Sequence, residues 1–499
     1  MSYLLAIDIG TTHCKAITFD TSCKAVHSLK ATYATISDEP GQSEQNPDEI
    51  VQQVTTLIAQ SLQANTAIQG VCFSAAMHSI IAVDKEGKTL TNVIIWADTR
   101  SSQQAARLKN SNQGSIIYQK TGVPIHPMSP LCKLIWMKEK MPQVFNEAYK
   151  FISIKEYLFY KLFGKYIIDH SIASATGLFN IHDITWCSEA LEAASITSDK
   201  LSMPVPVTHI EKELTATSKQ LLAMNNDIAF ITGGNDGCLA NLGCGAINSG
   251  DAALTIGTSG AVRTTCTTKQ LDSAQRLFSY LLTDDIVITG GAINNGGVVL
   301  EWFGKLMVGN DKSVNIDDLL QQAATAPAGA ENLLFLPYIL GERAPMWDAD
   351  AKGVFFGLSS QHTQAHLARA VVEGICFAMR SVVAAIEDTS GSIHNLYASG
   401  GFMQSTFWLQ LLADVLGKEL SINNSADASA AGAAIIGFYA LGIIDNLNAS
   451  NQYFKTEKVY KPQENVQQHY DALFQIFQSL YPVLKDSFHD LSTLDNLSL

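Results

Sequence analysis

The chain has 499 residues, of which 47% are hydrophobic and 16% charged, and its formal net charge is −14 at pH 7. This composition is that of a globular protein, and the length exceeds the roughly 250–300 residues at which one hydrophobic core usually stops growing. The acidic balance, without a long Lys/Arg block, excludes nucleic acid and anionic membranes as expected partners.

The first predicted element is a β-hairpin over residues 4–20, LLAIDIGTTHCKAITFD. Its turn, Gly10-Thr11-Thr12, lets a ligand approach the backbone closely, and its N–H groups and hydroxyls suit phosphate oxygens. Asp8 precedes the turn, where a carboxylate would repel phosphate unless a divalent cation or its water lay between them. Lys15, on the second strand, can supply positive charge to the phosphates. Taken alone, Asp8 is more typical of a turn cap and Lys15 of a solvated strand edge.

Strand-like and helix-like segments then alternate, which predicts an α/β fold. Pro47, followed by Asp48 and Glu49, predicts the start of a helix over 47–63, because proline suits the first turn and acids face the positive end of the helix dipole. Further strands are predicted at 70–75, 79–84, 92–98, 228–234, 253–257, 286–291 and 395–401, and further helices at 364–388 and 406–417.

A second glycine-hydroxyl turn, Gly257-Thr258-Ser259, follows an apolar strand near the middle of the chain. Because it lies about half the chain length after Gly10, we predict two domains of similar plan, over 1–246 and 247–499. Ordinary hairpin chemistry can also produce one such recurrence. If the two turns act together, they would hold one polyphosphate.

A third cluster of small residues, Gly400-Gly401, joins a predicted strand to a helix that begins near Ser405. Such a turn can pack against a nucleobase, although an ordinary strand-to-helix turn has the same composition. The small-residue segment from Ser429 is predicted to be a helix that packs closely against a neighbouring helix.

Cysteine usage and the apolar segments indicate the compartment. Nine cysteines without C-x-x-C spacing are typical of reduced thiols in cores rather than of a disulfide framework. The first residues, MSYLLAIDIG, lack the features of a signal peptide, and the nearly apolar segment 430–444 is shorter than the roughly 18 residues that a spanning helix needs. We therefore expect a soluble, cytoplasmic protein.

The chain resembles the FGGY carbohydrate kinases, a family of the actin-like ATPase superfamily. DIGTTHCK resembles the family's first phosphate motif, GTSG its second, and SGGFMQSTFWLQLLADVLGKEL its adenosine motif. MSPLCKLIWMKE and GVFFGLSSQHTQAHLARAVVE resemble the two long family signatures, and GERAPMWD resembles the block before the second. The resemblance implies two ribonuclease-H-like domains that flank a deep cleft, with sugar mainly on the N-terminal side and ATP mainly on the C-terminal side.

The resemblance also implies ATP and Mg²⁺ as cofactors, a homodimer, and roles for individual residues. Asp236, in GGNDG, is expected to be the catalytic base that accepts the proton of the sugar hydroxyl, although this setting is also typical of an Asx-turn. Mg²⁺ is expected at Asp8 through water. The implied nucleotide and phosphate residues are Gly10, Thr11, Thr12, Lys15, Gly257, Thr258, Ser259, Gly297, Glu301, Gly400, Gly401 and Ser405, with Glu301 where some relatives carry glutamine.

Two segments bear on the substrate. SAAMHS places Met77 and His78 where glycerol kinases carry an Arg-Glu pair, and TGVPIHPMSP is similar to the gluconokinases of the family. The resemblance therefore implies D-gluconate as the substrate. Asp98 can accept hydrogen bonds from sugar hydroxyls. The carboxylate of an aldonate needs a cationic partner or one with several donors. The candidates for the carboxylate are His78, Arg100, His126 and Lys133, although such residues are also typical of packed loops and solvated helix faces.

Two alternatives stay open at the level of the sequence. The first is D-xylulose, or another pentulose, as the substrate. The second is an actin-like protein that uses nucleotide to switch binding or assembly, because a fold does not fix a function.

Overall fold

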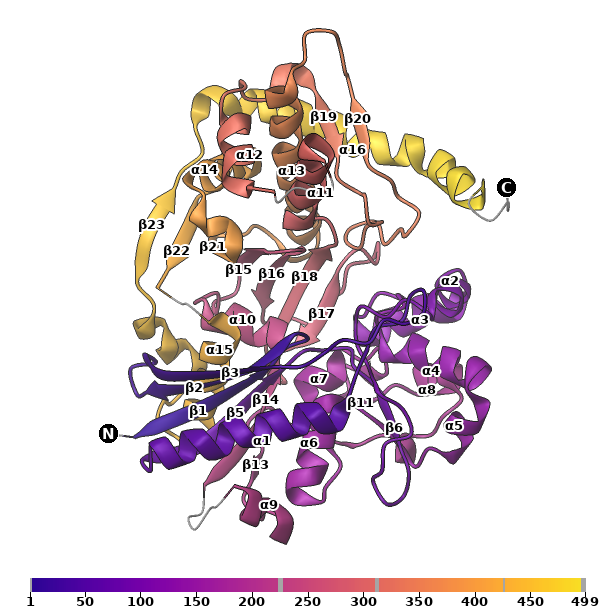
Figure 1. Ribbon diagram of the computed structural model, residues 1–499, viewed down its shortest axis with the longest axis vertical. Helices are drawn as coiled ribbons and strands as arrows, with labels where there is room; N and C mark the ends of the chain where they lie inside the picture. Colours follow the sequence, from indigo (N-terminus) through magenta and orange to yellow (C-terminus); the bar gives the residue numbers. More distant parts are fainter. Residues whose placement is uncertain (1, 223–227, 310–313, 425–426, 495–499) are drawn as a thin grey trace. The chain divides into compact units, whose positions relative to one another are not determined.

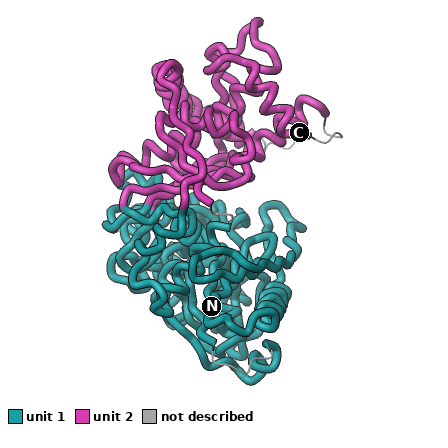
Figure 2. The backbone as a smooth tube through the Cα atoms, turned by 90° about the vertical axis from the view of Figure 1, so that its left-hand side faces the viewer, with its two compact units in different colours: residues 1–248, 265–288, 425–454 teal, residues 249–264, 289–424, 455–499 magenta. Residues whose placement is uncertain are grey.

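The computed structural model describes residues 2–222, 228–309, 314–424 and 427–494. These residues form two compact units that are interleaved in sequence (Figure 2). Unit 1 comprises residues 1–248, 265–288 and 425–454, and unit 2 comprises residues 249–264, 289–424 and 455–499. Each unit contains a β-sheet and helices, which confirms the predicted α/β class (Figure 1).

The sheet of unit 1 has six strands in the order β13-β14-β5-β1-β2-β3. β1 (Tyr3–Ile9) and β2 (His13–Asp20) form the predicted hairpin, and β3 (Ala25–Thr32) extends it. β5 (Ile68–Ala75) is parallel to β1, β14 (Ala229–Asn235) is parallel to β5, and β13 (Ile210–Glu211) closes the edge in the antiparallel direction.

Strand β1 alternates between the two faces of this sheet, as a period of two residues requires. Leu5, Ile7 and Ile9 belong to the core that α1 (Pro47–Ala64) covers. Leu4 faces the other side of the sheet and packs against α15 (Ala428–Ala440). A Cβ on Gly437 of this helix would lie only 2.5 Å from Cδ2 of Leu4. Asp8 shares that second face and meets Ser429 in the first turn of α15. This position explains why an apolar strand carries a carboxylate.

Helix α15 crosses α10 (Asp236–Gly243) through two glycines. A Cβ on Gly243 would lie 1.8 Å from Ala428 O, and a Cβ on Gly432 would lie 2.0 Å from Leu239 O. The two backbones are therefore in direct contact, which confirms the predicted close packing of the small-residue helix.

The other elements of unit 1 are short. Between β3 and β14, Leu131 and Leu134 pack with Ile80 and Ile94 in a second hydrophobic core, and the neighbouring Lys133 donates to Ile94 O. The elements are β4 (Glu44–Gln45), β6 (Ile81–Val83), β7 (Val93–Ile94), α2 (Ser102–Lys109), α3 (Asn112–Thr121), α4 (Pro130–Lys140), α5 (Pro142–Glu147), β8 (Lys150–Ile152), α6 (Ile154–Phe163), β9 (Ile167–Asp169), α7 (His170–Ser174), β10 (Phe179–Asn180), β11 (Thr185–Trp186), α8 (Ser188–Ala194), η1 (Ser198–Lys200), β12 (Met203–Val205), α9 (Ala216–Leu221), β17 (Phe278–Leu281) and η4 (Leu447–Tyr453).

The second sheet has seven strands in the order β17-β18-β16-β15-β21-β22-β23, and most of its residues belong to unit 2. β15 (Asp251–Ile256) and β16 (Gly260–Cys266) form the second predicted hairpin, β21 (Asn395–Ser399) is parallel to β15, and β22 (Leu420–Asn423) is parallel to β21. The remaining elements are β18 (Val287–Ile293), α11 (Gly297–Val308), α12 (Ile316–Ala324), η2 (Ala330–Asn332), β19 (Leu334–Leu336), β20 (Val354–Phe356), α13 (Gln364–Ser390), η3 (Gly401–Gln404), α14 (Thr406–Leu416), β23 (Thr456–Tyr460) and α16 (Glu464–Leu494).

The two sheets share one plan. In each, a hairpin is followed by two parallel strands and then by an antiparallel edge strand, which is β13 in unit 1 and β23 in unit 2. The glycine-hydroxyl turns occupy equivalent places, between β1 and β2 and between β15 and β16. The recurrence in the sequence therefore marks a structural repeat, as predicted.

The nine cysteines are free, and all except Cys23 are buried, as predicted for reduced core thiols. Across the described ranges, no helix combines the length and the hydropathy that crossing a membrane requires.

Candidate active site

The carboxyl ends of three parallel strands meet at one edge of the sheet of unit 1. The register pairs Ile9 of β1 with Ala75 of β5, and Ala75 with Asn235 of β14. The residues that follow these strands therefore lie next to one another: the turn 10–12, the segment 76–79 and Asp236. This edge is where open α/β sheets bind ligands.

The first turn presents N–H groups rather than carbonyls. The carbonyl of Gly10 accepts a hydrogen bond from the Tyr33 hydroxyl, and the carbonyl of Thr11 accepts one from Gln45 Nε2. Among the described residues, neither Thr11 nor Thr12 uses its backbone N–H in a hydrogen bond. Two successive unpaired N–H groups form a concave donor set for an anion.

Asp8 and Lys15 lie opposite each other in the hairpin, below this turn. Lys15 Nζ forms an ion pair with Asp427, and Ser429 Oγ donates to Asp8 Oδ2 at 2.9 Å. Asp8 Oδ1 is buried and has no hydrogen-bond partner within the described part of the chain. Burial raises the pKa of Asp8, while the nearby hydroxyls of Ser74 and Ser429 and the charge of Lys15 oppose the rise.

Asp236 is the first residue of α10, directly after β14. The buried Asn235 caps the helix: its side chain accepts from the N–H of Cys238 at 2.7 Å and donates to Ser171 Oγ at 2.9 Å. Gly233, two residues before Asn235, makes this backbone geometry feasible. Gly233 has φ 62°, and a Cβ there would lie 1.8 Å from Phe73 O, where the register between β14 and β5 shifts. The half-buried Asp236 carboxylate accepts from the N–H of Gly237 at 2.7 Å.

Met77 and His78 follow β5 at the same edge. Met77 lines a small cavity together with Gly10 and Thr11. His78 is buried and adopts φ 69°, a left-handed conformation that is strained for a residue with a Cβ. Its Nδ1 lies 2.7 Å from Ala175 O, so Nδ1 carries a proton because a carbonyl only accepts. Its Nε2 lies 3.4 Å from the hydroxyl of Tyr280.

Asp98 and Arg100 form a linked pair. The buried Asp98 carboxylate accepts from the Ser43 N–H at 2.9 Å and from Arg100 Nε at 2.9 Å. Arg100 Nη2 also binds Glu44, and the guanidinium lies 4.5 Å from the ring centre of Trp136. In the described part of the chain, Nη1 of Arg100 donates no hydrogen bond.

The other two candidates for the carboxylate differ in exposure. The half-buried His126 accepts through Nδ1 from the N–H of Met128 at 3.2 Å. Lys133 is completely buried in the first turn of α4, and its Nζ donates to main-chain carbonyls.

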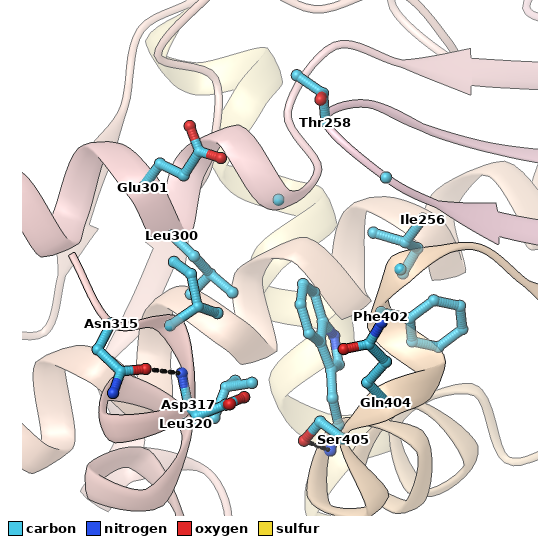
Figure 3. A pocket seen from close by; sticks show the side chains of 15 residues that line it. Ile256, Thr258, Leu300, Glu301, Asn315, Asp317, Leu320, Phe402, Gln404 and Ser405 are labelled. Atoms are coloured by element: carbon cyan, nitrogen blue, oxygen red, sulfur yellow. Dashed lines mark hydrogen bonds between the residues drawn. The ribbon is translucent and has the colours of Figure 1, made fainter. Parts of the chain in front are cut away.

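In unit 2, a pocket of about 380 Å³ brings together residues from the second turn and from the starts of three helices (Figure 3). Six of the residues predicted for the nucleotide line it: Gly257, Thr258, Gly297, Glu301, Gly401 and Ser405. In Figure 3 the side chains of Thr258 and Glu301 lie toward one end of the pocket, and those of Asn315 and Ser405 toward the other.

The second turn repeats the pattern of the first. The carbonyl of Gly257 accepts from the N–H of Gly297 at 2.7 Å, and that of Thr258 accepts from the N–H of Val298 at 3.2 Å. The N–H groups of Thr258 and Ser259 bind no other described residue. Both turns thus have occupied carbonyls and two successive N–H groups that pair with none of the described residues.

The remaining predicted residue, Gly400, lies beside the pocket with φ 104°, and a Cβ there would lie 2.5 Å from Ile256 O. Only glycine fits this close approach.

Sequence reasoning did not identify several residues of these sites. In unit 1 these are Tyr33, Glu44, Gln45, Tyr280, Asp427 and Ser429, and in unit 2 they are Ile256, Leu300, Asn315, Ile316, Asp317, Leu320, Phe402 and Trp408. Asn315 carries a local signal, because asparagine before Ile-Asp-Asp is typical of a helix start, and it indeed caps α12. That signal does not indicate a pocket.

Comparison with known proteins identifies the family. Residues 3–243 match the N-terminal domain of the FGGY family of carbohydrate kinases, and residues 252–441 match its C-terminal domain. A gluconokinase from Bacillus licheniformis is 38% identical over 501 residues, which cover 98% of both chains. A xylulose kinase from Staphylococcus epidermidis is 29% identical over 505 residues, which cover 99% of both chains.

Two solved structures from Lactobacillus acidophilus have the same fold. A gluconate kinase and a ligand-bound xylulose kinase each give a TM-score of 0.94 at 34% identity, cover 98% of this chain, and are themselves covered to 99% and 100%. The predicted family and its two-domain fold of the actin-like ATPase type, with ribonuclease-H-like sheets, are confirmed. The chain belongs to the FGGY family of carbohydrate kinases.

Proposed function

We propose that this carbohydrate kinase transfers the γ-phosphoryl group of ATP to D-gluconate and forms 6-phospho-D-gluconate. The observation that carries the substrate is the full-length identity of 38% to a gluconokinase, against 29% to a xylulose kinase. The segment TGVPIHPMSP supports the same choice, because it is similar to gluconokinases.

In this proposal Asp236 is the catalytic base. A sugar hydroxyl is a poor nucleophile, and a carboxylate within hydrogen-bond reach can accept its proton as the bond to phosphorus forms. The position of Asp236 supports the role, since the residue begins a helix at the edge where the first turn and Met77 also lie.

The N–H groups of the two turns are proposed to bind the phosphate oxygens of ATP. Lys15 is proposed to supply a positive charge to the same phosphates. The unpaired N–H groups of Thr11 and Thr12 in unit 1, and of Thr258 and Ser259 in unit 2, are oriented donors that need no rearrangement when a phosphate binds. The pocket of about 380 Å³ in unit 2 is proposed to take the adenosine, with Gly297 and Glu301 on one wall and Gly401 and Ser405 on another.

The residues at Asp8 fit a magnesium ion. Its Oδ1 is buried without a partner among the described residues, and such an oxygen needs a cation or an ordered water. Among those residues no group of three or more His, Cys, Asp or Glu side chains converges, so we propose that Asp8 holds the ion through water. When bound with ATP, Mg²⁺ neutralises charge that develops on the phosphates.

On the sugar side, the candidates for the carboxylate are His78, His126 and Nη1 of Arg100, and Asp98 keeps the guanidinium in place. We propose that Met77 forms the wall between the sugar and the first turn. The cytoplasmic location and the homodimer remain predictions from the sequence.

D-Xylulose is the alternative substrate, because the xylulose kinase from Lactobacillus acidophilus is as similar in structure as the gluconate kinase. Membership of a carbohydrate kinase family argues against the other alternative, an actin-like assembly protein.

A coupled assay of ADP release tests the proposal across D-gluconate, D-xylulose, L-ribulose and glycerol. We expect kcat/KM for gluconate to exceed that for each other compound by at least about tenfold. A tenfold preference for a ketose would overturn the substrate but leave the kinase activity in place.

The same assay tests the base. Asp236→Asn should lower kcat about 10³-fold, because the carboxamide cannot accept the proton, while the Kd for ATP stays within about twofold. Asp445→Asn, at an exposed position of unit 1, is the matched control and should retain full turnover. Turnover near the wild-type value in Asp236→Asn would remove Asp236 from this role.

A further inference from the structure

Lys133 combines a positive charge with complete burial. Its side chain is 0% exposed and lies in the first turn of α4, which Ser129 caps. Its Nζ donates to His78 O at 2.7 Å and to Ile95 O at 2.7 Å, and it lies 3.5 Å from Ile94 O.

These contacts account for every proton of the ammonium group. A lysine has three N–H donors and no acceptor, and here three main-chain carbonyls surround the nitrogen. No donor is left for an oxygen of a substrate. A burial this complete also lowers the pKa of Lys133 to about 7, although the negative charge of Asp98 opposes the shift.

The three carbonyls belong to two segments that carry the sugar-side candidates. Ile80 and Ile94 pair through hydrogen bonds of 3.1 and 2.9 Å, and Lys133 joins the two segments directly beyond this bridge. One segment contains Met77 and His78. The other runs on from Ile95 to Asp98 and Arg100.

One of these three carbonyls belongs to His78, whose backbone is strained. His78 keeps φ 69° while its carbonyl is held by Lys133, its Nδ1 by Ala175 O, and its Nε2 lies beside Tyr280. A non-glycine residue stays in this region only when its surroundings fix it. Without the Lys133 donors, the backbone at His78 would lose the contact that orients its carbonyl.

We infer that Lys133 is a positioning residue for sugar binding, which clamps the His78 segment to the Asp98–Arg100 segment from inside and does not itself touch the sugar. This inference rests on the proposed function only in taking the sugar to bind at these two segments. It predicts a defect in sugar affinity rather than in the chemical step or in nucleotide binding.

The test uses Lys133→Met, which keeps the length of the side chain and removes all donors. For whichever sugar the wild-type enzyme phosphorylates, we expect its KM to rise at least about tenfold, with the KM for ATP within about twofold and kcat within about threefold. Lys140→Met, on the exposed end of the same helix, is the control and should match the wild type.

Equal losses in both KM values and in kcat, or an unchanged KM for the sugar, would overturn the inference. A crystal structure of the wild-type enzyme with the sugar bound is the second measurement, which stands even if Lys133→Met does not fold. We expect Nζ to stay on His78 O and Ile95 O, and a sugar oxygen within 3.5 Å of Nζ would contradict the inference. Because the assay takes the sugar that the enzyme uses, a wrong substrate proposal would not affect this result.

Discussion

At the scale of single residues, Glu342 supports the pocket proposed for the nucleotide without lining it. Its buried carboxylate accepts from the N–H groups of Asn294 and Arg343, and Asn295 Nδ2 donates to it at 3.0 Å. These contacts fix the corner that leads into Gly297, whose N–H binds the second turn. The GERAPMWD block therefore supports the pocket through the contacts of Glu342 with Asn294 and Asn295.

Glu342 also gives a pH dependence with a definite sign. Burial raises its pKa to about 7, against the hydrogen bonds that favour the charged form. The folded protein thus holds this proton more tightly than the unfolded chain, so the group's contribution to stability is present below about pH 4.5 and is lost as the pH rises toward 7.

We predict that the melting temperature of the wild type falls more steeply between pH 5 and 7.5 than that of Glu342→Gln, a difference equivalent to about 2 kcal/mol. Calorimetry on the two proteins measures it. Glu156 is also buried, and its pKa is likewise raised to about 7. Both proteins contain it, so its contribution to the pH dependence cancels in the comparison. Parallel curves would show that Glu342 does not titrate in this range.

The residues with chemistry next to glycine turns were predictable, because Asp8, Lys15 and Thr258 stand within a few positions of the pattern that marks them. Their partners were not. Tyr33 and Gln45 occupy the carbonyls of the first turn from positions 23 and 34 residues away, and no local pattern indicates which distant side chain will do so.

At the scale of elements, the crossing of α10 and α15 determines where two acids lie. α10 begins with Asp236, α15 begins beside Asp427, and the helices touch through Gly243 and Gly432. A change in their separation would move the first turn of each helix, and with it the contact of Ser429 with Asp8.

We predict that Gly432→Ala lowers both stability and kcat. The new Cβ would lie 2.0 Å from Leu239 O, which is main chain and cannot rotate away, so the helices must separate at a cost of about 1–3 kcal/mol. Chemical denaturation and the ADP assay measure the two effects. Tyr439→Ala, at an exposed position of the same helix, is the control. Unchanged stability and turnover in Gly432→Ala would contradict the packing argument.

The long periodic segments and most of the short predicted strands correspond to observed elements: β5, β6, β14, β15, β18 and β21 lie at six of the seven predicted strand positions. The predicted helices at 47–63, 364–388 and 406–417 correspond to α1, α13 and α14. The predicted strand at 92–98 was wrong in extent, since β7 ends at Ile94. The carbonyl of Ile95 turns to accept from Lys133 and from the N–H of Asp98, which ends the strand.

At the scale of the whole molecule, the repeat of the two sheets was predictable from the two glycine-hydroxyl turns, whereas the interleaving of the units was not. Residues 265–288 and 425–454 return to unit 1 and bring Tyr280, Asp427 and Ser429 to His78, Lys15 and Asp8, respectively. These returns depend on contacts between segments hundreds of residues apart. A motif read in its own neighbourhood contains no information about them.

In the proposed function, unit 2 supplies the adenosine pocket, and unit 1 supplies the sugar-side candidates together with the first phosphate turn. The pocket proposed for the nucleotide is lined only by residues of unit 2, and the sugar-side candidates belong only to unit 1. We therefore predict that hydrogen exchange separates the two ligands. A non-hydrolysable ATP analogue alone should protect amides at 256–259, 297–301 and 401–408, because these segments form the wall of its pocket.

The sugar alone should protect 76–80 and 94–100 instead, since a ligand that rests on these segments suppresses the local openings through which their amides exchange. Helix α9, which follows the edge strand β13 in the chain and lines neither site, is the internal reference and should exchange at one rate in every sample. Protection of 76–80 by the analogue alone, as strong as protection by the sugar, would mean that the nucleotide occupies the site assigned to the sugar. The division of substrates between the two repeats would then have to be reversed, because a hydroxyl and a γ-phosphoryl group cannot share one position before they react.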